Sequence, residues 1–400
     1  MKLKIGNPAT GDDFFRREKL KNRILRALER DHVAFVGPRR TGKTSLLKDI
    51  EANPPSGHLV VFLNLEEFDS VPGWIAAMLS ETKRLLSKPS NAGWIEKSGK
   101  AAKEILARIE GIEVLGSGIK ITPGKSASDS WRPLADQFRD LLRETDFPLY
   151  FLLDEFPWYL GFVAKKYTPA EVESALNWFR GMRQELAGGR TRFLVTGSIG
   201  LDGLLRRLGL SPAANDFDTL EIPPLNDGEA IDFLKKLSTG ESVPLTDAGI
   251  DKILKLLGAN WPILLELFIS EIQDADFTEP PNDAQLESIY RDRMVRGARN
   301  KYCQEMFNRL AKEEMFSPME RQLAQEILKL MVSRDRSGME DFEAIHARIV
   351  PDPAIRAITG SELAFVLDTL RHDGYILRRD DGFYRFASNI LKDYWQHRTV

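Results

Sequence analysis

The stretch Gly37-Pro-Arg-Arg-Thr-Gly-Lys-Thr44 decides the fold of this chain. It matches the pattern G-x-x-x-x-G-K-[ST] without a gap, and it lies between an apolar segment at 32–36 and a helical pattern at 45–50. Glycines let the backbone curl so that its N–H groups converge on phosphate oxygens, and the N-terminus of the following helix adds positive potential. The sequence therefore predicts a phosphate-binding loop between a strand and a helix.

The residues of this loop are the first candidates for binding a nucleotide: Gly37, Pro38, Arg39, Arg40, Thr41, Gly42, Lys43, Thr44 and Ser45. In loops of this kind the lysine reaches the β- and γ-phosphates, and the hydroxyl residue after it holds Mg²⁺. We therefore expect ATP or ADP and Mg²⁺ as cofactors, with Lys43 on the phosphates and Thr44 on the metal ion. A chance match in a turn is the alternative, and the flanking strand and helix argue against it.

A second candidate element is the apolar run at 150–153, which ends in Asp154 and Glu155. At the end of a parallel strand next to the loop, Asp154 would hold Mg²⁺, mostly through water. Glu155 would polarise the attacking water as a general base. Two carboxylates that merely solvate a strand end are the alternative, but the run is paired with a phosphate-binding loop in the same chain.

The apolar segment at 191–196 ends in Thr196, and Ser198 follows two residues later. Either hydroxyl could face the γ-phosphate across from the loop, where it would orient the water or contact the phosphate. A simple turn at the end of a strand explains the same residues equally well. Both interpretations stay open.

The first half of the chain alternates strand and helix patterns. The predicted strands are 32–36, 58–64, 148–153 and 191–196, and the predicted helices are 16–30, 45–50, 71–87, 131–144 and 169–187. The strands are apolar on both faces, which is typical of a parallel sheet covered by helices on both sides. The fold class is therefore α/β. A weaker region contains a predicted helix near 94–110 and a predicted hairpin within 111–122.

From Pro223 onward helical patterns replace the strands. Helices are predicted at 227–239, 246–257, 261–274 and about 283–313, followed by three more, a hairpin at 375–386 turning on Asp381-Gly382, and a last helix at 387–397. We therefore expect three domains: an α/β domain at 1–222, an all-helical domain at 223–315 and a small helix-rich domain with a β-wing at 316–400.

The composition is that of a globular protein. Of 400 residues, 42% are hydrophobic and 29% charged, and 56 Lys and Arg against 59 Asp and Glu leave a net charge of −3, which argues against a generic nucleic-acid coat. One cysteine, Cys303, excludes an intrachain disulfide framework and a multi-cysteine metal site. No apolar run has the length of a signal-peptide core or of the ~20 residues of a membrane span, so we expect a cytoplasmic protein without a membrane partner.

These residues resemble the prokaryotic STAND-type P-loop ATPases of the AAA+ neighbourhood, including the archaeal-ATPase branch related to origin-recognition ATPases. Asn7-Pro8, followed by Phe15-Arg-Arg-Glu18, is similar to the entry box of that family, although Arg16 replaces its usual glycine. The resemblance implies that Asn7 and Pro8 contribute to an adenine pocket. The loop at 37–45 and Asp154-Glu155-Phe-Pro are similar to the Walker A and Walker B motifs of the same branch.

The resemblance continues into the second half of the chain. Residues 215–225 are similar to the segment that enters the lid, and Gly258-Ala-Asn-Trp-Pro262 to the G-x-P signature of the lid, here with three residues between glycine and proline. It implies that Pro262 packs near the adenine and senses the nucleotide, whereas a proline in the first turn of a helix is the alternative. In such families an arginine of one subunit often completes the site of a neighbour, for which Arg206 and Arg207 are the candidates. Two solvated helix arginines are the interpretation we favour.

Residues 317–397 resemble a winged helix, with a candidate recognition helix at 361–372 and a wing at 376–386. The helix offers one arginine against three acids, which is a poor match to base edges. The wing is more basic, with Arg378, Arg379 and Arg385. DNA contact by the wing and docking of a protein or of a second copy both stay open. The basic stretch 291–301 spreads its charges around a helix, and we favour a solvated hinge helix over a phosphate-binding surface.

Three functions are compatible with these observations. An ATP-driven conformational switch that hydrolyses ATP and controls a partner or self-assembly is the leading hypothesis. A DNA-linked AAA+ ATPase, such as a loader or a regulator of transposition or replication, is the second, and a nucleotide-stabilised scaffold without turnover is the third. No nucleophile constellation of Ser/His/Asp or Cys/His type and no zinc-like spacing of the five histidines is evident.

Overall fold

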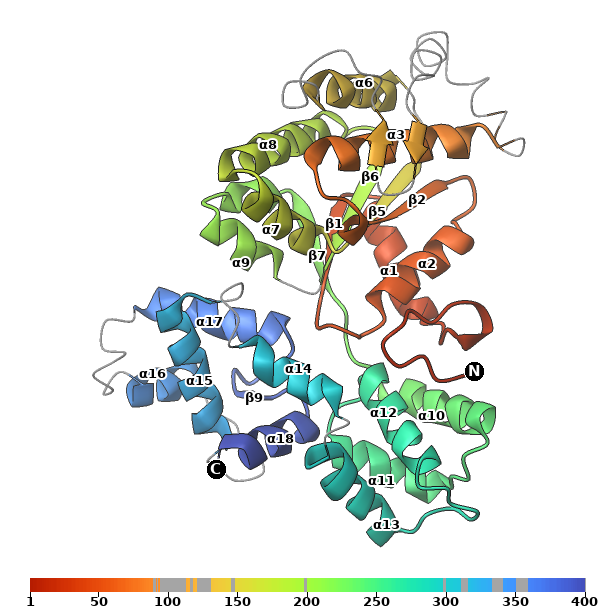
Figure 1. Ribbon diagram of the computed structural model, residues 1–400, viewed down its shortest axis with the longest axis vertical. Coiled ribbons are helices and arrows are strands. Elements are labelled where there is room, and N and C mark those ends of the chain that lie inside the picture. Colours follow the sequence, from red (N-terminus) through yellow and green to blue (C-terminus); the bar gives the residue numbers. More distant parts are fainter. Residues whose placement is uncertain are drawn as a thin grey trace. The chain divides into compact units, whose positions relative to one another are not determined.

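The computed structural model describes residues 1–88, 91, 93, 113–115, 118–120, 131–144, 148–197, 200–297, 300–310, 316–332, 341–349 and 359–399 (Figure 1). The chain divides into two compact units. The α/β unit comprises Arg16–Val36 and Lys43–Ile222, and the helical unit comprises Met1–Phe15, Gly37–Gly42 and Pro223–Val400. The phosphate-binding loop and the N-terminal segment thus group with the second half of the chain. The division into three domains stays a prediction.

The α/β unit is built on a parallel five-stranded sheet in the order β2-β5-β6-β1-β7. The strands are β1 (His32–Val36), β2 (Leu59–Asn64), β5 (Leu149–Asp154), β6 (Arg192–Thr196) and β7 (Phe217–Glu221). The four predicted strands and the α/β fold class are confirmed. β7 was missed because only Leu220 of its five residues is buried, which is typical of an edge strand rather than of an apolar run.

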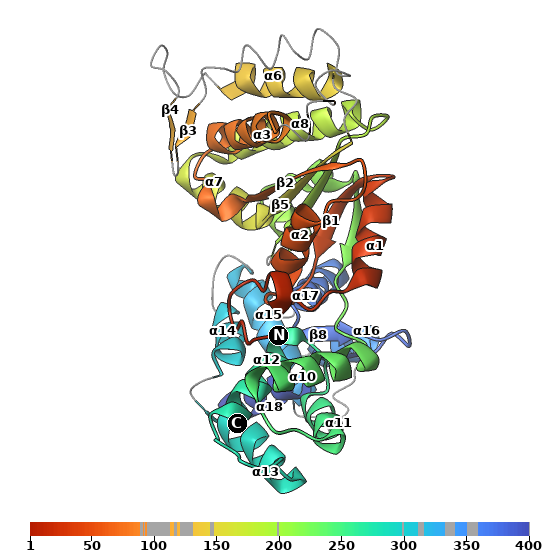
Figure 2. The same cartoon turned by 90° about the vertical axis from the view of Figure 1, so that its right-hand side faces the viewer.

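Helices cover both sides of this sheet, as predicted. They are α1 (Glu18–Leu28), α2 (Lys43–Ala52), α3 (Val71–Leu86), α6 (Trp131–Glu144), α7 (Phe156–Lys166), α8 (Pro169–Glu185) and α9 (Leu201–Arg207). Figure 2 shows α1 and α7 on opposite sides of the sheet. The sequence did not predict α7, and it anticipated α9 only as the helix that carries Arg206 and Arg207. Residues 113–115 and 118–120 pair as antiparallel strands β3 and β4, which confirms the hairpin, whereas the predicted helix near 94–110 lies outside the described residues.

The core of the α/β unit is aromatic. Trp74 of α3 is fully buried, and its ring packs edge-on against Phe156 and Tyr159 of α7 and Phe179 of α8. On average such aromatic pairs stabilise a fold by about 0.5–1.5 kcal/mol beyond their burial. This cluster fixes the start of α7, and therefore the end of β5 where the two candidate carboxylates lie.

The helical unit contains α10 (Asp227–Glu241), α11 (Asp247–Leu257), α12 (Pro262–Gln273), α13 (Asp283–Ser288), a π-helical segment (Ile289–Val295), α14 (Lys301–Arg309), α15 (Pro318–Val332), α16 (Phe342–Ile349), α17 (Gly360–His372), the antiparallel pair β8 (Ile376–Arg378) and β9 (Tyr384–Phe386), and α18 (Asn389–Thr399). These bounds agree with most of the predicted helices and with the hairpin. Gly382 in its turn has φ of +87°, a conformation that favours glycine. No described helix is both long and apolar enough to cross a bilayer.

The predicted continuous helix at 283–313 is wrong. The chain leaves the helix after the π-helical segment, and Asn300 starts α14 by accepting a hydrogen bond from the Cys303 backbone N–H at 3.0 Å. The amide of the same side chain donates to the Met294 carbonyl at 2.6 Å. Asn300 therefore satisfies both broken ends at once, which an apolar pattern does not reveal.

The basic stretch inside this region is neutralised by its own surroundings. Arg291 pairs with Glu287, Arg293 with Glu271, and Arg296 with Asp292, at N–O distances of 3.3, 3.6 and 3.5 Å. Arg299 lies outside the described residues. Acids therefore match the three described arginines, and a hinge role for this segment stays a prediction.

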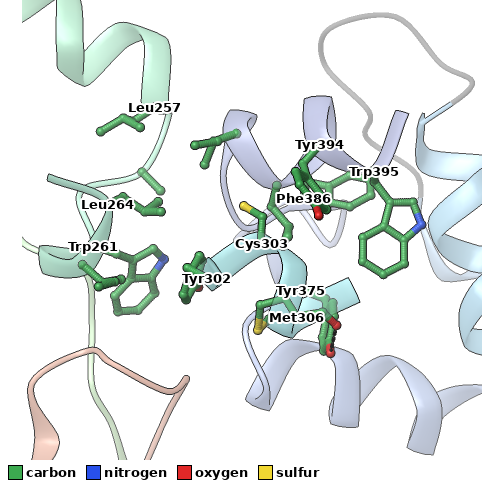
Figure 3. Close-up of a cluster of buried hydrophobic side chains, with 14 of the residues drawn as sticks. Leu257, Trp261, Leu264, Tyr302, Cys303, Met306, Tyr375, Phe386, Tyr394 and Trp395 are labelled. Atoms are coloured by element: carbon green, nitrogen blue, oxygen red, sulfur yellow. Dashed lines mark hydrogen bonds between the residues drawn. The ribbon is translucent and has the colours of Figure 1, made fainter. Parts of the chain in front are cut away.

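One apolar cluster runs through the whole helical unit, from α10–α12 to the β8–β9 hairpin and α18. Figure 3 shows Trp261 and Leu264 facing Tyr302 of α14, and beyond it Phe386 and Trp395. The Asn389 amide also donates to the carbonyls of Lys255 and Leu256 at 3.2 and 3.3 Å, where α11 ends. The N-terminal segment joins the unit through Phe15, whose ring lies edge-on to Phe233, 5.3 Å between centroids.

Candidate nucleotide site

The α/β unit brings the two halves of the predicted metal site together. Thr44 lies in the first turn of α2, and Asp154 is the last residue of β5. The Thr44 hydroxyl donates a hydrogen bond to Asp154, with 2.6 Å between Oγ1 and Oδ2. Lys43, which precedes Thr44, is only 5% exposed. Two hard oxygen donors thus meet at the helix that begins directly after the predicted phosphate-binding loop.

Burial dominates the electrostatics of Asp154, which is 2% exposed. Burial raises the pKa of this carboxyl from 3.8 to about 6, against the lowering effect of the Thr44 hydrogen bond. The neighbouring Glu155 raises the same pKa, and Lys43 lowers it. A desolvated carboxylate gains strongly from a cation placed beside it, and the residues present therefore fit an Mg²⁺ ion.

Glu155 has a strained backbone. It stands between β5 and α7 in the left-handed region, with φ 55° and ψ 32°, which costs a residue other than glycine about 1–2 kcal/mol. Its backbone N–H donates to Asp154 Oδ1 at 3.1 Å. The chain therefore turns between the two consecutive carboxylates, so that Asp154 and Glu155 can have different roles.

Gly197 directly follows β6, and its lack of a side chain leaves space for the turn at Glu155. A Cβ atom built on Gly197 would lie 2.5 Å from Cδ of Pro157 and 3.6 Å from Oε2 of Glu155. Any side chain here would therefore push on the turn that carries Glu155. Sequence reasoning missed this residue, and its only signal was a glycine immediately after an apolar strand.

Thr196 ends β6, the strand between the one that leads into the loop and the one that ends in Asp154. It is 2% exposed, and its Oγ1 has no hydrogen-bond partner among the described residues. An unpartnered buried hydroxyl is unfavourable by itself and suggests a ligand that completes it. Ser198, the other candidate, lies outside the described residues.

The loop at Gly37–Gly42 belongs to the helical unit. Gly42 has φ of +91° and Arg40 has φ of 60°, while the Thr41 hydroxyl donates to the Pro38 carbonyl at 2.8 Å. Arg40 and Gly42 thus have positive φ on either side of Thr41, and such alternation turns backbone N–H groups toward one concave side that suits phosphate groups. Ser45, the last residue of the predicted set, is buried and is the third residue of α2.

The remaining candidates belong to different units of the chain. Arg206 and Arg207 are exposed in the last turn of α9 in the α/β unit. In the helical unit, Asn7 and Pro8 are exposed, and half-buried Pro262 is the first residue of α12. Their roles stay predictions. No group of three or more His, Cys, Asp or Glu side chains suited to a metal ion occurs in the described part of the chain.

A solved structure shares this fold. The chain is similar to a Walker-type ATPase of Pyrococcus abyssi, with a TM-score of 0.58 and 18% identity over 97% of this chain and 98% of that one. The α/β unit has the P-loop NTPase fold. Weaker likenesses are to the ORC2 protein of Aeropyrum pernix, at a TM-score of 0.45 and 11% identity over 94% of this chain and 91% of that one, and to Cdc6p of Pyrobaculum aerophilum, at 0.41 and 14% over 98% of both.

Comparisons of the sequence itself find no matching family model and no matching curated protein. At 18% identity the structural likeness shows the fold alone. The chemistry of the site therefore depends on its own residues.

Proposed function

We propose that the chain binds ATP and hydrolyses it to ADP and phosphate through the motif at 37–45 and the carboxylates of Asp154 and Glu155. The observation that carries the proposal is the 2.6 Å hydrogen bond between Thr44 and Asp154. It joins the hydroxyl of the motif, in the first turn of α2, to a buried carboxylate at the end of β5. A chance sequence match would not produce this pairing. In P-loop NTPases the same two side chains hold Mg²⁺.

The residues divide the binding work between them. The backbone N–H groups of Gly37–Gly42 and the Lys43 ammonium would bind the phosphates, and Thr44 and Asp154 would hold Mg²⁺. The bound Mg²⁺ supplies charge neutralisation on the phosphate oxygens. Lys43 is buried, so its charge interacts with an anion more strongly than a solvated lysine would.

Glu155 is the proposed general base. It would accept a proton from the attacking water as the oxygen bonds to the γ-phosphorus and the bond to the β-phosphate oxygen breaks. The Thr196 hydroxyl would orient that water or the γ-phosphate, which gives its unsatisfied Oγ1 a partner. The left-handed turn at Glu155 supports this division because it separates the base from the metal-holding Asp154.

We further propose a molecular switch of the STAND or AAA+ kind, with an ATPase domain at 1–222, a lid at 223–315 and a winged helix at 316–400. The nucleotide would be sensed by Pro262, with Asn7 and Pro8 at the adenine. Arg206 or Arg207 of a second copy would complete the site in an assembly. Nucleotide state would then control a protein partner or self-assembly, through contacts that differ between ATP and ADP.

Nucleotide binding and phosphate release by the purified chain test the proposal. The wild type should bind ATP and ADP with Mg²⁺ and release phosphate, whereas Lys43→Ala should lose at least about tenfold in affinity, the loss expected for a buried charge contact to phosphate. Equal affinity of the wild type and Lys43→Ala, or no binding by either, contradicts a nucleotide site at this loop.

DNA contact through the β8–β9 hairpin is the second candidate. Arg378 and Arg379 are exposed at this hairpin, although Arg379 pairs with Asp381 at 3.2 Å. The test is binding of duplex DNA by the full chain at several salt concentrations, with Arg378→Ala and Arg379→Ala combined. Salt-sensitive binding that the double variant loses supports contact by the hairpin, and no binding at low salt contradicts it.

A further inference from the structure

Two arginines of the phosphate-binding loop share one carboxylate. Nη1 of Arg39 lies 2.6 Å from Oε1 of Glu305, and Nη2 of Arg40 lies 3.3 Å from Oε2 of the same residue. All three side chains are roughly one-third exposed, between 29% and 38%. Glu305 lies in α14, more than 260 residues along the chain from the loop. The two positive charges next to the candidate phosphate site are therefore already engaged by an acid of the helical unit.

The helix that carries Glu305 is firmly anchored. Tyr302, Cys303 and Met306, its neighbours in α14, are each 5% exposed or less and belong to the apolar cluster of the unit. The Tyr375 hydroxyl donates to the Met306 carbonyl at 2.7 Å, a bond drawn in Figure 3. Because α14 cannot move without disturbing this core, Glu305 has a fixed position from which to hold the loop.

A second contact holds the same loop without charge. Gly374, between α17 and β8, has φ of +80°, and a Cβ atom there would lie 2.5 Å from Cγ of Pro38. Only a glycine allows the backbone to approach the loop so closely. Pro38 is the same residue whose carbonyl accepts the Thr41 hydrogen bond. The loop is thus held at two places. Glu305 pairs with its two arginines, and the backbone at Gly374 packs against its proline.

We propose that Glu305 is a positioning residue that latches the phosphate-binding loop to α14, and that nucleotide phosphates compete with it for Arg39 and Arg40. The inference rests on the proposed nucleotide site and names a regulator of it. A polyphosphate carries more charge than one carboxylate and would draw the same two guanidinium groups. Because coupling between two equilibria is reciprocal, a latch that weakens nucleotide binding is itself weakened by nucleotide.

The test compares Glu305→Gln with a matched control, Glu326→Gln. Glu326 of α15 also makes a 2.6 Å ion pair, with Lys329, and is 35% exposed, so both variants remove one paired surface charge from the same unit. Glu305→Gln should bind fluorescent ADP about two- to tenfold more tightly at ordinary salt, the range for removing one unit charge near a polyphosphate. Glu326→Gln should match the wild type. If the wild type binds ADP, unchanged or weaker binding by Glu305→Gln overturns the proposal.

A measurement without nucleotide separates this inference from the proposed function. Trypsin cleaves after Arg39 and Arg40, and the cleavage rate at these bonds, followed by mass spectrometry, reports how often the loop is released. The nucleotide-free rate should rise about two- to fivefold in Glu305→Gln, the loss expected for partly exposed ion pairs, and stay unchanged in Glu326→Gln. Glu305→Asp, which keeps the charge but shortens the side chain, should also speed cleavage and serves if the glutamine variant does not fold.

The outcomes are distinct. Tighter ADP binding without faster cleavage would mean simple charge repulsion and would overturn the latch. Faster cleavage in a chain that binds no nucleotide at all would support the latch while contradicting the proposed function. A wild-type cleavage rate in Glu305→Gln, with any nucleotide result, contradicts the latch.

Discussion

The Thr44 hydroxyl donates a hydrogen bond to the Asp154 carboxylate across 2.6 Å, although 110 residues separate them in the chain. Thr44 is the second residue of α2, which follows the loop after β1, and Asp154 is the last residue of β5, which is separated from β1 by β6 in the sheet. The parallel topology puts the carboxyl ends of the strands at one edge, so both motifs are delivered to the same place. This contact forms the candidate metal site.

Turnover should depend on pH through Asp154. Burial raises the pKa of this carboxyl to about 6, so in the absence of Mg²⁺ its charge is present above that pH and is lost as pH falls through it. We therefore expect the Mg²⁺ concentration for half-maximal turnover to rise about tenfold for each pH unit below about 6. Phosphate release measured between pH 5 and 8 at several Mg²⁺ concentrations checks this. A Mg²⁺ requirement that does not change over this range contradicts it.

Asp154→Asn should stabilise the nucleotide-free protein while abolishing turnover. The folded pKa of Asp154 lies above its ordinary value of 3.8, so this group costs stability above about pH 6 and the cost disappears as pH falls below about 4. Removing the charge should raise the free energy of unfolding at pH 7.5 by about 1–3 kcal/mol. The lower end of this range applies if the hydrogen bond from Thr44 is also lost. Urea unfolding of both proteins at pH 7.5 and pH 4 measures the difference, which should shrink at the lower pH.

Gly197→Ala should disturb the base without touching the loop. The added Cβ would lie 2.5 Å from Pro157 Cδ, so the turn at Glu155 must shift. We expect a loss of about 1–3 kcal/mol in unfolding free energy, typical of overpacking, and a clear fall in turnover with nucleotide affinity retained. Gly181→Ala is the control, because nothing lies within 4 Å of a Cβ at this position in α8. An active, stable Gly197→Ala protein would contradict the close approach.

Thr196→Val separates a working hydroxyl from a structural one. The two side chains have nearly the same shape, and the Oγ1 lost has no partner among the described residues. Stability should stay equal or rise by about 1 kcal/mol, since an unsatisfied buried hydroxyl is removed. Turnover should fall about tenfold or more if the hydroxyl orients water or phosphate. Thermal unfolding and phosphate release together decide, and unchanged turnover would make Thr196 a structural residue.

Local patterns made much of this fold predictable. The loop motif and the four buried strands stand out because glycine spacing and unbroken apolar runs are visible in a few consecutive residues. β7 was missed because an edge strand has no such run, and the break before α14 was missed because one side chain, Asn300, satisfies both helix ends. Neither feature changes the spacing of apolar residues from which strands and helices are predicted.

The sequence predicted that Thr44 and Asp154 share one site, but it did not predict the residues that support them. Thr44 and Asp154 were each identified from their motifs, and the parallel order of the strands then brings them into contact. The sequence did not point to Gly197 or Glu305, since each matters only through a partner elsewhere in the chain. Close approach and long-range ion pairing are properties of the packed structure.

The central claim, that the chain hydrolyses ATP with Glu155 as base, is tested most directly by Glu155→Gln. The wild type should release phosphate from Mg²⁺-ATP, and the variant should bind ATP with similar affinity, release phosphate at least about 100-fold more slowly and retain ATP unhydrolysed. Phosphate release gives the rate of hydrolysis, and chromatography of the bound nucleotide shows whether ATP is retained unhydrolysed. Turnover by Glu155→Gln at the wild-type rate would contradict the account.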